Sequence, residues 1–129
     1  MHRYLLLVLL LAVVSCSAAP QGGRASHWSG PVGQIETTFN QAVAAYQKDD
    51  RETATRLAQD AYFDIFESSG METAIRQDIS ARRASELEFA FGKVRQRIRT
   101  GAQPSDVRQS VSEVMALLRE DAARLPGSG

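Results

Sequence analysis

The chain has 129 residues, in which 15 lysine and arginine side chains balance 15 aspartate and glutamate side chains. This length suits one domain, and the balanced charge leaves no basic excess with which to bind nucleic acid. A single cysteine excludes an internal disulfide or covalent haem, and the two histidines, His2 and His27, leave the rest of the chain without a catalytic triad or a histidine-ligated zinc site.

Residues 1–15 have the features of a secretory signal peptide. A short positive segment precedes ten apolar residues at 5–14, and ten helical residues span about 15 Å, which is too short to cross a bilayer. Residues 13–16, Val-Val-Ser-Cys, fit the box at which bacterial lipoproteins are cut before the cysteine that is acylated. We therefore expect lipidation of Cys16, a lipid anchor in the membrane and an extracytoplasmic location. The alternative is ordinary signal-peptide cleavage after Ala18 or Ala19.

Residues 16–33 are predicted to form a flexible tether. The segment 21–33 contains four glycines, two serines and Pro31, a composition that is typical of flexible linkers. It also contains the only tryptophan, Trp28, which either docks onto the domain or marks a partner site.

Residues 34–125 are predicted to be a helical domain. Apolar residues recur at steps of three and four, which is the period of one helix face, and no segment shows strand alternation. These stripes predict helices from about Val32 to Tyr46, from a capping box at Asp49 and Glu52 to about Ser68, from Met71 to Thr100, and from Pro104 to Leu125. Residues 126–129 are expected to be a disordered tail.

The third predicted helix is longer than its neighbours. Thirty helical residues would be about 45 Å long and would overhang the others. We therefore expect a kink or a split near residues 78–82, with Ser80 as an internal cap. Short connections favour antiparallel neighbours. The predicted fold is thus all-α, an up-and-down four-helix bundle.

A charged pair interrupts an apolar stripe of the third helix. Glu86 lies four residues before Ala90, and Arg83 lies three residues before Glu86, so both fall on the stripe that contains Ala90. Burying a charge costs several kcal/mol unless the charge is paired. Arg83 and Glu86 therefore form an ion pair at the edge of the bundle, or Glu86 is a ligand that Arg83 holds. Glu88 falls on another face and is expected to be solvated.

Two further carboxylates, Glu67 and Glu72, flank one tight turn. Glu67 belongs with Asp60 and Asp64 to an acidic stripe, and Glu72 completes a capping box with Ser69. Oxygen ligands suit iron, magnesium or calcium. One hypothesis is therefore a hard-cation site formed by Glu67, Glu72 and Glu86, with Arg83 and Asp64 in support. The other hypothesis is that these side chains are caps and solvated groups.

The central residues also carry a family pattern. Residues 61–67, Ala-Tyr-Phe-Asp-Ile-Phe-Glu, precede Gly70-Met71-Glu72 and then Arg83, Glu86 and Phe89. This pattern resembles the periplasmic helical domain of the bacterial high-affinity, Ftr-type iron permeases, over roughly residues 34–125. The resemblance implies that Glu67, Glu72 and Glu86 are the positions that concern iron. The chain lacks the Arg-Glu-x-x-Glu transport motif of that family, so the resemblance implies a free-standing extracytoplasmic module.

Together these patterns predict an exported, non-enzymatic helical module that is associated with iron uptake. It would bind iron or another hard cation through carboxylates, and its partner would be an iron-uptake membrane protein or another envelope protein. The alternative is a structural or protein-interaction lipoprotein without a metal site, in which arginines pair with the carboxylates. An enzyme is disfavoured because no histidine, cysteine or lysine lies near a serine or tyrosine to activate it.

Overall fold

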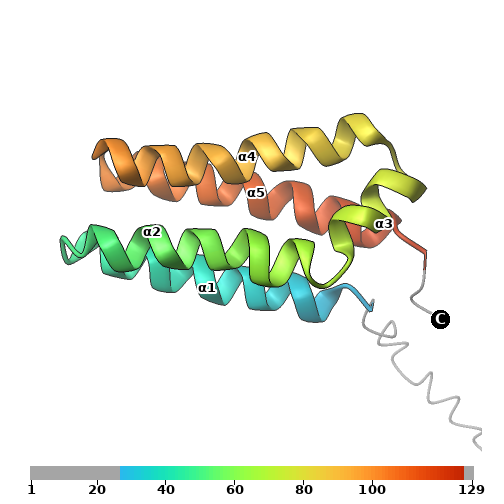
Figure 1. The fold of residues 1–129 in the computed structure, drawn as a ribbon, viewed down its shortest axis with the longest axis horizontal. Helices are drawn as coiled ribbons and strands as arrows, with labels where there is room; N and C mark the ends of the chain where they lie inside the picture. Colours follow the sequence, from blue (N-terminus) through green and yellow to red (C-terminus); the bar gives the residue numbers. More distant parts are fainter. Residues whose placement is uncertain (1–26, 127–129) are drawn as a thin grey trace, which may run out of the picture.

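The computed structural model describes residues 27–126, which are all-helical and contain no strand (Figure 1). The predicted signal peptide, Cys16, residues 16–26 of the predicted tether and residues 127–129 lie outside the described residues. The elements are α1 (Ser29–Gln47), α2 (Arg51–Asp60), the π-helix η1 (Ala61–Glu67), α3 (Met71–Asp78), α4 (Ala81–Thr100) and α5 (Pro104–Arg124).

Helix α1 begins at Ser29, so residues 29–33 are helical and the boundary predicted at residue 34 is too late. Pro31 lies in the first turn, where its missing N–H costs no helical hydrogen bond. Trp28 is only 8% exposed, and its indole Nε1 donates a hydrogen bond to the carbonyl oxygen of Pro126 over 3.4 Å. The packing of Trp28 thus ties the start of α1 to the chain that follows α5, which favours a helix in spite of the glycines.

Helix α2 continues directly into the π-helix η1. Its N-cap is Asp50, whose side chain accepts from the N–H of Thr53 over 3.1 Å. The predicted capping box at Asp49 and Glu52 is therefore wrong, since Asp49 lies in the preceding turn with a φ of 63°. At the end of η1 the carbonyl oxygen of Phe63 accepts from the N–H of Ser68, five residues later, and also from the Ser68 hydroxyl over 2.7 Å.

The split predicted near residues 78–82 is confirmed. Helix α3 ends at Asp78, and α4 begins at Ala81 behind the N-cap Ser80, whose hydroxyl accepts from the N–H of Arg83 over 3.0 Å. Helix α4 ends at Thr100, as predicted, and its C-cap is Gly101, whose φ of 74° is left-handed. The capping box predicted at Ser69 and Glu72 is wrong, because Gly70 is the N-cap of α3 and makes no side-chain hydrogen bond.

The long helices lie side by side and alternate in direction along the chain (Figure 1). Helix α1 packs against α2 and α5, and α4 packs against the same two helices, while the short α3 lies across one end. Their facing stripes bury the core. Its largest fully buried side chains are Phe39, Phe66, Phe91, Ile35, Met71, Ile75, Leu87, Ile98 and Leu118. Over residues 27–126, no helix combines the length and the apolar character that are needed to cross a membrane.

Candidate functional site

The π-helix η1 places two neighbouring aromatic rings in different surroundings. Tyr62 is partly buried, and its ring centroid lies 5.3 Å from that of Phe91 and 5.8 Å from that of Phe66. Phe63 is 50% exposed, and its ring meets the Tyr62 ring edge-on with a centroid distance of 4.9 Å. Short π-helical turns are frequent at functional sites, because they redirect side chains within an otherwise regular helix. Phe63 is thus an apolar ring that η1 turns toward solvent.

Arg95 of α4 lies against both rings. Its guanidinium carbon is 5.0 Å from the centroid of the Tyr62 ring and 5.8 Å from that of Phe63. Its Nη1 atom is buried without a hydrogen-bond partner. Burial lowers the pKa of Arg95, and the charge of Arg99, one turn away, acts in the same direction. The aromatic faces offer a weak attraction to this cation, of about 0.5–2 kcal/mol, so Arg95 is a partly buried cation beside an exposed ring.

A cluster of charges surrounds the hydroxyl of Tyr62. The Nη2 atom of Arg76 lies 2.9 Å from Glu72 Oε1 and also 2.9 Å from Glu88 Oε1. The Tyr62 hydroxyl donates to Glu72 Oε2 over 3.4 Å. Burial, followed by the negative charges of Glu72, Glu88 and Glu67, raises the pKa of Tyr62 to about 12. The phenol therefore stays protonated at neutral pH and acts as a donor, while the Arg76 guanidinium lies between the two carboxylates.

Arg83 joins α4 to α5, and its main partner is not the one predicted. Its Nε atom lies 2.8 Å from Oδ2 of Asp121, which is fully buried. This hydrogen bond is the largest cause of the raised pKa of Arg83. Two exposed carboxylates also lie near the Arg83 guanidinium. Glu120 Oε2 is 3.1 Å from its Nη2 atom, and Glu86 Oε2 is 3.3 Å from its Nη1 atom. Glu86 thus belongs to a cluster between α4 and α5.

The structure does not bring Glu67, Glu72 and Glu86 together as the sequence predicts. Glu72 pairs with Arg76, and Glu86 pairs with Arg83 and, over 3.2 Å, with Arg82. Within residues 27–126, no group of three or more histidine, cysteine, aspartate or glutamate side chains could hold a metal ion.

The remaining predicted site residues lie on the surface. Glu67 is exposed on η1, and so is Asp64, the predicted supporting residue. The carboxylate that shares Arg76 with Glu72 is Glu88, whose side chain is 40% exposed. The sequence did contain a signal for this face of α4. Glu88 and Arg95 are seven residues apart, so they lie on the same face of the helix.

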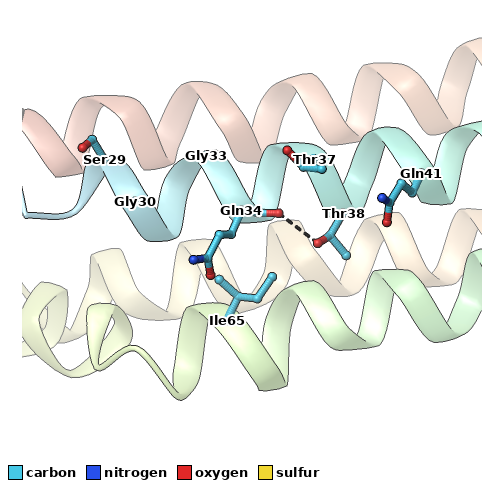
Figure 2. Close-up of a pocket in the computed structure, with 8 residues that line it drawn as sticks. All are labelled: Ser29, Gly30, Gly33, Gln34, Thr37, Thr38, Gln41 and Ile65. Atoms are coloured by element: carbon cyan, nitrogen blue, oxygen red, sulfur yellow. Dashed lines mark hydrogen bonds between the residues drawn. The ribbon is translucent and has the colours of Figure 1, made fainter.

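An open hollow of about 730 Å³ lies over α1 and η1. Figure 2 shows the residues that line it. The side chains that line it are small or uncharged, and Thr38 uses its hydroxyl to donate to the carbonyl oxygen of Gln34 over 2.8 Å. No ionisable group lines this hollow, so it offers neither acid–base chemistry nor metal ligands. Its lining residues are Ser29, Gly30, Gly33, Gln34, Thr37, Thr38, Gln41 and Ile65.

Comparisons with family models, curated proteins and solved structures find no match to this chain. The resemblance to the periplasmic domain of iron permeases therefore stays a prediction that rests on the residues quoted for it.

Proposed function

We propose that this chain is an exported, non-enzymatic helical module that docks onto an envelope protein through Phe63 and Arg95, which we call the docking surface. The observation that carries the proposal is the half-exposed ring of Phe63, which lies 5.8 Å from the guanidinium carbon of Arg95. Aromatic and arginine side chains dominate the few interface positions at which truncation costs about 2 kcal/mol or more.

The local structure holds the docking surface ready for a partner. The carbonyl oxygen of Phe63 accepts two hydrogen bonds from Ser68, and its ring lies 4.9 Å from the Tyr62 ring and 5.8 Å from the guanidinium carbon of Arg95. A side chain that is already ordered loses little conformational entropy when it binds. Full burial of a phenylalanine side chain is worth about 1.5–3 kcal/mol, and half of the Phe63 surface remains open for such burial.

The proposal assigns Glu72 and Glu86 to ion pairs rather than to iron. The support is geometric. The Nη2 atom of Arg76 lies 2.9 Å from Glu72 Oε1, and the Nε atom of Arg82 lies 3.2 Å from Glu86 Oε1. A cation bound there would first have to displace Arg76, Arg82 and Arg83. Of the two hypotheses from the sequence, the interaction lipoprotein is therefore the one that we adopt.

The cellular context and the finer fold are part of the same proposal. The lipoprotein-type residues 1–16 favour an extracytoplasmic chain that is anchored through Cys16. The alternating directions of α1, α2–η1, α4 and α5 favour an up-and-down four-helix bundle, with α3 as an extra turn at one end. The resemblance to iron permease domains makes an iron-uptake membrane protein the first partner to test.

Site-specific photo-cross-linking tests the docking surface in cells. A benzophenone amino acid replaces Phe63 in the full chain, and the control places it at Gln41, an exposed residue of α1. We expect a discrete adduct with one envelope protein from position 63 and none from position 41. The adduct should weaken when Arg95→Gln is added. Equal adducts from both positions, or none from position 63 in a folded and exported chain, would contradict the proposal.

A further inference from the structure

A second surface, separate from Phe63, lies between α2 and α4. It is an open groove of about 410 Å³, and its lining is rich in guanidinium groups. The side chains of Arg51, Arg56 and Arg99 contribute three positive charges, while Glu52 contributes one negative charge. The uncharged polar side chains of Thr55 and Gln59 complete the lining.

Two of these arginines have no carboxylate partner among residues 27–126. Arg56 pairs with Asp60 over 3.2 Å, but Arg51 and Arg99 form no ion pair within the described part of the chain. This contrasts with Arg76, Arg82, Arg83, Arg119 and Arg124, each of which lies within 4.0 Å of a carboxylate oxygen. Arg51 and Arg99 are thus two of the six described cations that form no ion pair, and they are the two that line the groove together with Arg56. The other four are Lys48, Arg95, Arg97 and Arg108.

The end of α4 fixes the position of one of these arginines. The Nη2 atom of Arg51 lies against Gly101, the C-cap of α4, where a Cβ atom would come within 3.0 Å of it. The carbonyl end of a helix attracts a cation and so favours this position. Arg51, Arg56 and Arg99 carry like charges along this one groove. These like charges repel one another, and an anion bound among them would relieve that repulsion.

We propose that the groove formed by Arg51, Arg56 and Arg99 binds a phosphate group. Guanidinium groups match the oxygens of phosphate with paired, charge-assisted hydrogen bonds, and Thr55 and Gln59 offer further polar contacts. The phosphate has two chemical sources, an anionic phospholipid headgroup or a free phosphate or phosphate ester. Binding to this groove does not depend on the docking surface, because it uses neither Phe63 nor its ring contacts.

The test uses residues 16–129 expressed without the signal sequence, so that no acyl chain contributes to binding. One arm measures thermal unfolding with inorganic phosphate against sodium chloride at equal ionic strength. The other arm measures co-sedimentation with vesicles of phosphatidylglycerol against vesicles of phosphatidylcholine. The variant is Arg51→Gln with Arg99→Gln, and the matched control is Arg108→Gln, which removes an exposed arginine from α5.

We expect binding in at least one arm. If the chain binds phosphatidylglycerol vesicles but phosphate does not change its Tm, the source of the bound phosphate group is the lipid headgroup. If phosphate raises the Tm, the source is free phosphate or a phosphate ester. Each arginine that is removed from the groove should weaken vesicle binding about fivefold, since a basic residue near an anionic surface contributes about 1 kcal/mol. Arg108→Gln should bind like the parent chain. Absence of binding in both arms, or a control variant that loses as much binding per removed arginine as the double variant, would overturn the proposal and leave the docking surface unaffected.

Discussion

Arg83→Met is expected to lower the free energy of unfolding by about 3–5 kcal/mol, because it leaves a buried carboxylate without its main partner. Asp121 is fully buried on α5, and the Nε atom of Arg83 is 2.8 Å from its Oδ2. Its other cationic neighbour, Arg124, lies 3.8 Å away. Urea unfolding followed by circular dichroism measures the loss.

Two further variants identify the cause of that loss. Arg82→Met removes an arginine one position earlier whose side chain is 89% exposed, and it should cost less than about 1 kcal/mol. The double variant Arg83→Met with Asp121→Leu replaces both ions with apolar groups and should recover most of the stability. If Arg83→Met costs no more than Arg82→Met, the ion pair does not hold α4 to α5. Glu86→Ala should cost far less than Arg83→Met, because Asp121 keeps Arg83 paired.

The second large effect is expected at Phe91, whose replacement by alanine should cost about 3–5 kcal/mol. Phe91 is fully buried at the meeting point of three other rings. Its centroid is 4.9 Å from that of Phe66, 5.3 Å from that of Tyr62 and 5.6 Å from that of Phe39. Alanine would leave a cavity at the contact between α1, η1 and α4. Thermal or denaturant unfolding measures the cost.

Phe89→Ala is the matched control for this substitution. Phe89 lies two residues earlier on α4, and it is 75% exposed, so its truncation removes little buried surface. We expect a change within about 0.5 kcal/mol. Similar losses from the two variants would mean that the ring cluster around Phe91 does not form the centre of the core.

Much of the fold was predictable because local signals and packing agree. The apolar spacing predicted α1 and α5, and the residues at that spacing, such as Ile35, Phe39, Val107 and Leu118, are buried. Ser80 and Gly101 marked the ends of α4 through capping, which depends on neighbouring residues alone. The start of α1 was missed because Gly30, Pro31 and Gly33 are poor helix formers, and the buried Trp28 outweighs them through a contact that the sequence does not display.

The candidate site was less predictable because its partners come from distant parts of the chain. Asp121 is 38 residues beyond Arg83, although its place three residues after Leu118, on the apolar stripe of α5, was a usable signal. On α4 the stripe through Ala90 led to Glu86, whereas the fully buried line runs through Leu87, Phe91 and Val94. The residue pattern of 61–67 does not indicate a π-helix, so the exposure of Phe63 was not predicted.

An iron titration most directly tests the claim that the carboxylates pair with arginines and do not bind a metal ion. Thermal unfolding of residues 16–129 is followed with ferric iron and with ferrous iron, and magnesium and calcium serve as controls. A ligand at a hundredfold excess over its Kd adds about 2.7 kcal/mol to the stability of a folded state that binds it. We predict no change in Tm, because Arg76 already lies 2.9 Å from both Glu72 and Glu88. A rise with iron that is lost in the double variant Glu67→Ala with Glu72→Ala would contradict this account and restore the carboxylate iron site.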